Sequence, residues 1–335
     1  MSPTGRKVPL PGKRCPTVPN PTMLTLQVVA RNAESDGVVS LVLADPMRVS
    51  LPAWTPGAHI DLHLEVPGQG EVVRQYSLCG DPSRDTEYRI AVLREPDGGG
   101  GSQHIHDALF PGTLARVSSP RNLFELGSGA PLVFVAGGIG ITPILPMVTR
   151  AQEQGIDWQL HYAGRSTETM AFTSELEPHA GRTFLYPADK GKRMDVHEIV
   201  RNAGQVVMYA CGPNRLLDAL QEAAGRYGRD LRVERFVNEN IVTAASDEPF
   251  SVELSESGLT LEVLPGESIL EVVSAAGVPV PSSCRGGTCG TCETFVLAGR
   301  PDHRDAILSA REREESEVMM ICVSRSKGGP ITLEL

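Results

Sequence analysis

Four cysteines near the C-terminus constrain the chain more than any other feature of its sequence. Separated in order by four, two and 29 residues, they are Cys284, Cys289, Cys292 and Cys322. This spacing, with a distant fourth cysteine, is typical of a plant-type [2Fe-2S] cluster. A structural zinc site would favour two C-x2-C knuckles or Cys/His pairs. The spacing therefore favours an electron-transfer centre and leaves zinc as the weaker alternative.

The loop that carries the first three cysteines, CRGGTCGTC, is rich in glycine. An oxidised cluster with four thiolates has a net negative charge, which backbone N–H groups aimed at the sulfur atoms stabilise. We expect Gly286, Gly287 and Gly290 to let the loop turn its amides inward, and Arg285 to add positive charge. The surface from Arg285 to Thr291 is the docking face that we expect for an electron acceptor.

The hydrophobic pattern changes twice along the 335 residues and predicts three domains. Short β-rich runs separated by Gly, Pro and Asp fill 23–126 and predict an antiparallel barrel or sandwich. Strands alternate with glycine turns and helices in 127–240, which predicts a doubly wound parallel α/β sheet. Two strands, a helix and the cysteine loop make up 249–335. The basic, proline-rich segment 1–22 is expected to be a disordered arm, and 241–248 a linker.

The net charge of −10 and the pI near 5.4 count against nucleic acid or an anionic membrane as the main partner. No run of about 18 apolar residues occurs, and the N-terminus lacks the apolar core of a secretion signal. Seven cysteines, four of them clustered, fit a reducing compartment better than a disulfide framework. We therefore expect a cytoplasmic protein without a membrane segment, acting as a monomer.

Two glycine turns in the middle domain follow strands and open helices. In the first, PLVFVAGGIGITPILPM, Gly138 and Gly140 would let the backbone approach a pyrophosphate, with Thr142 as N-cap and Pro143 at the first helical position. This glycine run is weak evidence alone, because a packed turn without a ligand would look similar. A second turn, CGP at 211–213, strengthens the interpretation as a nucleotide site. Both turns follow strands, and open α/β sheets bind ligands at the carboxyl ends of their strands. Cys211 itself fits a small buried hydrophobe equally well.

The first domain contains the motif RQYSLCGDP. Strand alternation places Arg74 and Tyr76 on one face, as a cation for a phosphate and an aromatic plane for stacking, with Ser77 on the other. An ordinary strand with a surface arginine is the alternative. Downstream, Ser102 is expected to cap a helix behind a glycine loop that ends at Gly101, which would form a phosphate site. The alternative there is a flexible hairpin loop.

The eight histidines show no metal-binding spacing. His59 and His63 alternate with Ile60, Leu62 and Leu64, so we expect these two histidines on the solvated side of a strand. The chain also lacks a P-loop and a G-x-S-x-G elbow, so neither ATP hydrolysis nor serine hydrolase chemistry is supported.

Taken in order, these motifs resemble the phthalate dioxygenase reductase family, the flavin and iron–sulfur reductases that feed multicomponent oxygenases. The order is R-x-Y-S, then P-R-N-x-F at Pro120–Phe124, then G-G-I-G-I-T-P, then C-G-P, then the ferredoxin cysteines. The match covers roughly Met23 to Leu335. The resemblance implies an FMN-binding Greek-key barrel, an NADH-binding domain of the ferredoxin reductase type and a C-terminal β-grasp ferredoxin domain.

The resemblance also implies which residues hold the cofactors. The expected flavin contacts are Arg74, Tyr76, Ser77, Gly101, Ser102 and Phe236. The expected nucleotide contacts are Gly138, Gly140, Thr142, Pro143, Cys211, Gly212 and Pro213. The expected cluster ligands are Cys284, Cys289, Cys292 and Cys322. FAD is the less favoured flavin, and Arg165, followed by Ser166, could grip a 2′-phosphate and so allow NADPH.

The implied function is that of an NADH-dependent reductase, which passes a hydride to flavin and then single electrons through the cluster to a terminal Rieske non-haem iron oxygenase. No side-chain acid or nucleophile is needed, so no catalytic residue is expected. A reductase for a cytochrome P450 is the second expectation, and docking to either partner should be transient. A non-enzymatic iron–sulfur redox sensor is the alternative of a different class, although a sensor has no use for a nicotinamide site.

Overall fold

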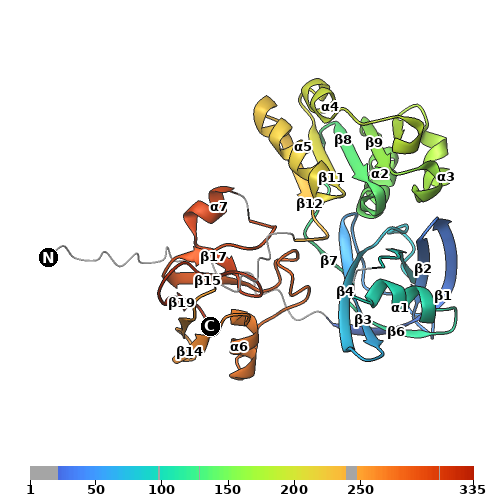
Figure 1. Cartoon of the computed structure of the whole chain (residues 1–335). Helices are drawn as coiled ribbons and strands as arrows, with labels where there is room; N and C mark the ends of the chain where they lie inside the picture. The colour runs from blue at the N-terminus through green and yellow to red at the C-terminus, as the bar shows by residue number, and fades with distance from the viewer. Residues whose placement is uncertain (1–21, 97–98, 128, 239–246, 309) are drawn as a thin grey trace. The chain divides into compact units, whose positions relative to one another are not determined.

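The computed structural model describes residues 22–96, 99–127, 129–238, 247–308 and 310–335 (Figure 1). The predicted N-terminal arm lies outside these ranges except for its last residue, and so does most of the predicted linker. Two compact units divide between Asn238 and Glu239, and the barrel and the nucleotide sheet belong to the same unit. None of the helices in the described ranges is long and apolar enough to cross a membrane.

The first part of the larger unit is an antiparallel barrel, as predicted. Its strands are β1 (Met23–Ser35), β2 (Val38–Ala44), β3 (Ala58–Val66), β4 (Gly70–Ser77), β5 (Glu87–Leu93), β6 (Leu114–Ser118) and β7 (Arg121–Asn122). They follow the order β4-β3-β6-β1-β2-β5, with β7 beside β3, and the bridge between Leu78 and Ile90 links the two edges of the sheet. Helix α1 (Gly101–Ala108) packs against β3 and β5.

The alternation in β3 is confirmed for the apolar residues but is wrong for His59. Ile60 and Leu62 are fully buried in the barrel core. His59, expected in solvent, is only 6% exposed, because β7 pairs with β3 there and brings Arg121 against the same face. The Arg121 guanidinium forms an ion pair of 2.7 Å with Asp61, so this face is polar and buried. Burial of a polar face is possible only where charges are paired in this way.

The second part of the larger unit is a parallel sheet with helices on both faces, as predicted. Its strands, in the order β10-β9-β8-β11-β12, are β8 (Leu132–Gly137), β9 (Trp158–Gly164), β10 (Thr183–Pro187), β11 (Val207–Cys211) and β12 (Asp230–Glu234). The helices are α2 (Ile141–Glu153), α3 (Thr173–Leu176), α4 (Val196–Asn202) and α5 (Asn214–Tyr227). Residues of α2 and α3 share one core cluster with the sheet, and those of α4 and α5 share the other. Strand order reverses between β8 and β11, so the two glycine turns meet there.

The motif P-R-N-x-F joins the barrel to the nucleotide sheet. The Asn122 amide donates hydrogen bonds to the Thr55 hydroxyl (2.8 Å) and to a neighbouring backbone carbonyl oxygen in the barrel. Phe124 is buried and packs edge-on against Tyr209 of β11, with the ring centroids 5.5 Å apart. The Tyr209 hydroxyl accepts the Gly127 N–H at 2.7 Å. The motif therefore acts as a structural joint.

The smaller unit has the β-grasp arrangement. Its strands are β13 (Phe250–Leu254), β14 (Leu259–Val263), β15 (Glu293–Ala298), β16 (Pro301–Asp302), β17 (Val318–Met320), β18 (Arg325–Ser326) and β19 (Ile331–Leu333). The main sheet has the order β14-β13-β19-β15-β17, with β13 and β19 parallel, and the helices are α6 (Ile269–Ala275) and α7 (Ala310–Glu315). Ser268 and Glu271 form a capping box at the start of α6, and Gly277, at φ 83°, follows its end, as the sequence predicts.

Candidate nucleotide, flavin and cluster sites

The two glycine turns at the end of β8 and β11 pack against each other. A Cβ atom on Gly140 would lie 2.3 Å from the Cys211 carbonyl oxygen, and one on Gly212 would lie 3.0 Å from the Gly137 Cα. Only glycine allows this approach, so Gly140 and Gly212 have a packing role whether or not a ligand is bound. Gly138, with φ 54°, faces open space instead. Its backbone is the part of the turn that remains accessible to a ligand.

The predicted N-cap at Thr142 is wrong. A 3-10 turn over Gly138–Gly140 runs directly into α2, so the N-cap is Gly140 and Pro143 is the third helical residue. The Thr142 hydroxyl donates to the Ile139 carbonyl oxygen at 3.0 Å. No side chain caps this helix, but the Ile141 N–H already donates to the Gly138 carbonyl oxygen and Pro143 has no N–H. The helix therefore offers few free first-turn donors, and the turn itself is the part of this end that a ligand could approach.

The barrel motif lies against the glycine loop. The Arg74 guanidinium donates to the Gly99 carbonyl oxygen at 3.3 Å, and a Cβ on Gly101 would lie 3.0 Å from the Arg74 Cγ. The predicted cap at Ser102 is wrong, because Gly100, at φ 77°, occupies the N-cap position. The Ser102 hydroxyl instead accepts the Glu95 N–H at 3.1 Å and closes the base of the loop.

Sequence reasoning missed Glu234, which meets the barrel motif at the last residue of β12. Ser77 hydrogen-bonds its carboxyl group, while the Oε2 atom is shielded from solvent and has no hydrogen-bond partner among the described residues. Burial raises the Glu234 pKa to about 8, and the Ser77 hydrogen bond opposes that rise. Although the residue is partly exposed as a whole, its carboxyl group is protonated at neutral pH. Its position at the carboxyl end of a parallel strand was the signal available in the sequence.

Cys211 lies beside Glu234 on the neighbouring strand. It is fully buried, and burial raises the pKa of its thiol well above the usual range. It also packs within the core formed by α2 and the sheet, which fits the interpretation as a small buried hydrophobe. Its contact with a nicotinamide ring stays a prediction.

Phe236 follows β12 and keeps its ring exposed. The preceding Arg235 is held on α5 by hydrogen bonds to Asn214 (3.0 Å) and Gln221 (2.6 Å), and Asn214 donates to the Val237 carbonyl oxygen. With its neighbours fixed, Phe236 remains 42% exposed. An exposed ring on a fixed backbone fits a stacking surface, and its contact with flavin stays a prediction.

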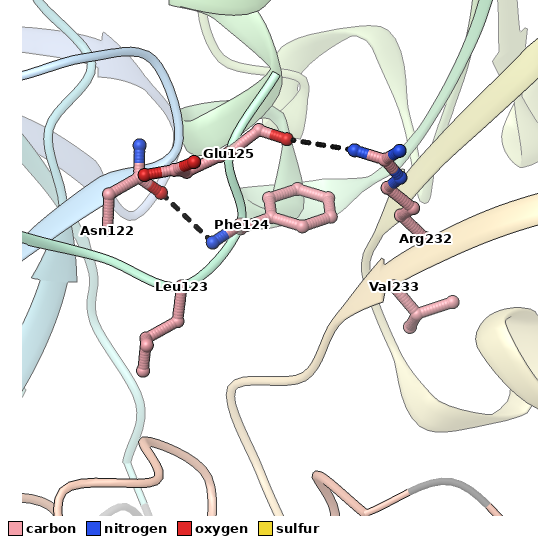
Figure 2. Close-up of a pocket in the computed structure, with 6 residues that line it drawn as sticks. All are labelled: Asn122, Leu123, Phe124, Glu125, Arg232 and Val233. Atoms are coloured by element: carbon pink, nitrogen blue, oxygen red, sulfur yellow. Dashed lines mark hydrogen bonds between the residues drawn. The ribbon is translucent and has the colours of Figure 1, made fainter. Parts of the chain in front are cut away.

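A hollow of about 400 Å³ lies where the barrel joins β12, and Figure 2 shows its lining. The Asn122 side-chain oxygen accepts the Phe124 N–H at 2.9 Å, and Arg232 donates to the Glu125 carbonyl oxygen at 3.4 Å (Figure 2). The lining residues are Asn122, Leu123, Phe124, Glu125, Arg232 and Val233. None of the sequence-predicted site residues belongs to this lining.

In the smaller unit the four predicted cluster ligands come together. Cys284 contacts the thiols of Cys289 and Cys322, and Cys322 also contacts that of Cys292. These sulfur contacts form a chain. In the described ranges, no three metal-binding side chains are grouped so that they could hold one metal ion together. A chain of four thiols fits a binuclear centre that takes two thiolates per iron.

The loop backbone stabilises negative charge on Cys284. The Gly286 and Thr288 N–H groups donate to its sulfur at 3.3 and 3.4 Å. These two backbone donors stabilise a thiolate at Cys284, the form of the side chain that binds a metal. Gly287 and Gly290, both at φ 68°, need to be glycine. Gly286 does not, because a Cβ there would meet only the Cys284 carbonyl oxygen at 3.6 Å.

Arg165 lies directly after β9, at the same end of the sheet as the glycine turns, and is exposed. Its carbonyl oxygen accepts the Asp189 N–H at 3.0 Å. The structure therefore places the residue that could grip a 2′-phosphate at the end of the strand next to β8.

Comparison with known proteins assigns this arrangement to a family. The 2Fe-2S iron-sulfur cluster binding domain family matches residues 252–327. The phenoxybenzoate dioxygenase subunit beta of Ectopseudomonas oleovorans is 41% identical over 319 residues, which cover 94% of this chain and 98% of that protein. An intact type IV self-sufficient cytochrome P450 monooxygenase of known structure is 40% identical with a TM-score of 0.81. That match covers 93% of this chain, which spans only 41% of the monooxygenase.

A solved structure of phthalate dioxygenase reductase matches the chain from end to end. It is described as a modular structure for electron transfer from pyridine nucleotides to [2Fe-2S]. It is 35% identical, with a TM-score of 0.70, and the match covers 93% of this chain and 98% of that one. The chain therefore belongs to the phthalate dioxygenase reductase family, the reductase components of multicomponent oxygenases.

Proposed function

We propose that this chain transfers electrons from NADH through bound FMN and a [2Fe-2S] cluster to a terminal oxygenase of the Rieske non-haem iron type. Bound FMN would take up a hydride and give up its two electrons singly, which matches a nicotinamide donor to a one-electron cluster. The observation that carries the proposal is the convergence of four thiols, Cys284 to Cys322, in a chain whose larger unit has two glycine turns at the carboxyl ends of adjacent parallel strands. Every residue named below acts as a binder or positioning group.

The flavin site is proposed at Arg74, Tyr76 and Ser77. Arg74 supplies a cation beside the glycine loop, and α1 begins in that loop, so both would hold the FMN phosphate. Phe236 supplies an exposed ring for stacking. FMN is favoured over FAD because the sequence contains no evident aromatic residue for an adenine ring.

The nicotinamide nucleotide is proposed to bind at the switch point. The accessible turn at Gly138, which leads into the start of α2, would hold the pyrophosphate. Glu234 would remain protonated at neutral pH, since burial raises its pKa to about 8. A neutral carboxyl group with one unpartnered oxygen supplies a hydrogen-bonding partner to a polar ring edge without adding charge. Ser77 fixes the position of that carboxyl group.

The exit of the electron path is proposed at the cysteine loop. Cys284 is only partly buried, whereas the other three ligand thiols are at least 93% buried, so the cluster would reach the surface on the Cys284 side. Arg285, at φ 49° and exposed, lies on that side. The face from Arg285 to Thr291 would dock the acceptor in a small, transient interface.

A cytochrome P450 is the second candidate for the partner. The specific observation in its favour is the match to a self-sufficient cytochrome P450 monooxygenase at a TM-score of 0.81. A reconstitution assay separates the two candidates. The purified protein is given NADH and either a Rieske oxygenase or a P450 encoded beside its gene, and product is measured against NADH consumed. Coupled turnover with the Rieske partner supports the proposal, and turnover with the P450 alone replaces it.

Two further proposals concern the state of the protein in the cell. The first is that the protein is cytoplasmic, since the described cysteines are all free, as suits a reducing compartment. We also propose that the chain acts as a monomer, because transient docking leaves the cluster face open. Fractionation of cells and light scattering on the purified protein test the two proposals separately.

A further inference from the structure

Two positively charged side chains, those of Arg165 and Lys190, follow neighbouring strands of the parallel sheet. Strands β9 and β10 are parallel neighbours with Gly164 opposite Pro187, so their carboxyl ends meet at one edge. Arg165 is the first residue after β9, and Lys190 ends the 3-10 turn after β10. Both side chains are exposed. The next strand in the sheet is β8, which carries the proposed pyrophosphate turn.

The two cations are held near each other by the backbone. The Asp189 N–H donates to the Arg165 carbonyl oxygen at 3.0 Å, which ties the loop after β10 to the loop after β9. Lys190 lies 3.8 Å from the Asp189 carboxylate at its closest. Within the described ranges, no carboxylate lies within ion-pair distance of the Arg165 guanidinium. Arg165 is therefore available to an anion from solution.

The carboxylate of the same loop lies near Lys190. Glu168 accepts hydrogen bonds from its own backbone N–H and from Ser166, and these bonds, with the charge of Lys190, hold the pKa of its carboxyl group below the usual range. In a site selective for NADH, an acidic residue at this strand end hydrogen-bonds the ribose 2′-hydroxyl and repels a phosphate. Here Asp189 and Glu168 both lie near Lys190, and no ion pair joins a carboxylate to Arg165 in the described ranges.

We propose that Arg165 and Lys190 bind the 2′-phosphate of NADPH, so that the protein takes NADPH as well as NADH. The inference rests on the proposed nucleotide site. A guanidinium binds two phosphate oxygens at once, and a lysine adds a point charge beside it. NADH would leave Arg165 without an anionic partner but would keep all contacts at the switch point. The two nucleotides therefore differ only at this strand end, and hydride transfer is unaffected.

Binding of two fragments tests the proposal without turnover. Calorimetry on the flavin- and cluster-loaded protein compares adenosine 2′,5′-bisphosphate with adenosine 5′-monophosphate. We expect the bisphosphate to bind at least about tenfold more tightly, a typical gain for a charge-assisted phosphate contact. Arg165→Ala should reduce that ratio to about threefold or less, with no change for the monophosphate, and Lys190→Ala should lower it partly. Arg226→Ala, in the last turn of α5, is the matched control and should leave the ratio unchanged.

Flavin reduction separates failure of this inference from failure of the proposed function. Wild-type protein should be reduced by either nucleotide, and Arg165→Ala should lose kcat/KM for NADPH while keeping that for NADH. Equal binding of the two fragments, with NADH still active, would overturn the 2′-phosphate site alone. If neither nucleotide reduces the flavin, the proposed function fails and the inference fails with it.

Discussion

Ser77, the last residue of β4, hydrogen-bonds the buried carboxyl group of Glu234, the last residue of β12. The contact links the barrel motif to the nucleotide sheet at the point where both strands end. Because burial raises the Glu234 pKa to about 8, this link is made by a protonated carboxyl group at neutral pH. The same pair predicts how stability depends on pH.

Glu234→Gln should flatten the pH dependence of stability. The unfolded chain releases the Glu234 proton near the ordinary pKa of 4.5, whereas the folded chain keeps it until about pH 8. The folded state therefore binds more protons in that window, and its stability falls as pH rises from 4.5 to 8. Each kcal/mol lost lowers the Tm of a unit this size by roughly 2–4 °C. Calorimetry at pH 5 and pH 8 should show a smaller fall in Tm between the two pH values for the variant than for the wild type.

The control for this measurement is Glu222→Gln, on the exposed side of α5, where the carboxylate forms a surface ion pair with Arg226. This control should show the same fall in stability with pH as the wild type. If Glu234→Gln also showed the wild-type fall, the Glu234 carboxyl group would titrate normally in the folded protein.

Gly140→Ala should destabilise the larger unit by roughly 3 kcal/mol. The added Cβ would lie 2.3 Å from the Cys211 carbonyl oxygen, and a backbone atom in a central strand cannot move aside cheaply. Gly225→Ala is the matched control, because it lies inside α5 with no atom within 4 Å of the new Cβ. It should stabilise by about 0.5–1 kcal/mol. Thermal unfolding measures both, and two variants of equal stability would refute the packing argument.

Arg304→Ala should destabilise the ferredoxin unit by about 2–3 kcal/mol, since it breaks a mostly buried ion pair. Arg304 donates to both oxygens of Asp247, at 2.7 and 2.9 Å, and to Asp302 at 2.8 Å. The bonds from Arg304 hold the pKa of Asp247 below its usual 3.8. The contribution of Asp247 to stability is therefore present above pH 3.8 and is lost as the pH falls through the folded-state pKa.

Denaturant titration of the full chain, followed by cluster absorbance, measures the effect of Arg304→Ala. The exposed pair Arg311 and Glu315 provides the control, because Arg311→Ala should change stability by less than about 0.5 kcal/mol. Equal effects of the two variants would mean that the Arg304 pair contributes no more than a surface contact.

Cys289→Ser should remove the cluster and leave flavin reduction by NADH largely intact. The residues proposed for flavin and nucleotide belong to the larger unit, whereas Cys289 is buried in the smaller one. Iron content and visible absorbance report the cluster, and bleaching near 450 nm, a general property of flavins, reports flavin reduction. Cys79→Ala, at a buried barrel cysteine whose thiol donates to the Arg89 carbonyl oxygen, should keep its iron. Loss of flavin reduction in Cys289→Ser would contradict the proposed order of the path.

The sequence predicted what depends on local pattern. Cysteine spacing picked out four thiols that come together in the fold, alternating strands and helices predicted the parallel sheet, and Ser268 marked the start of α6. The predicted caps at Thr142 and Ser102 were wrong. A 3-10 turn runs into α2 before Thr142, and the Ser102 hydroxyl accepts the Glu95 N–H instead of capping α1. These partners become visible only once the chain is folded.

Contacts between distant segments explain the remaining differences. His59 is buried because β7, some 60 residues downstream, covers its face. Glu234 is a candidate site residue because the Ser77 side chain, in the barrel, hydrogen-bonds its carboxyl group. No motif spacing in the sequence links these two positions. Periodicity reports which side of a strand is apolar, but it does not report whether a polar side is covered.

Anaerobic addition of NADH to the flavin- and cluster-loaded protein, followed by visible absorbance and electron paramagnetic resonance, tests the central claim most directly. The electron path from nucleotide to cysteine loop predicts that the flavin absorbance bleaches first. The resonance of a reduced [2Fe-2S] cluster, held by Cys284, Cys289, Cys292 and Cys322, should then appear. A protein whose flavin and cluster both stay oxidised in excess NADH would contradict the account.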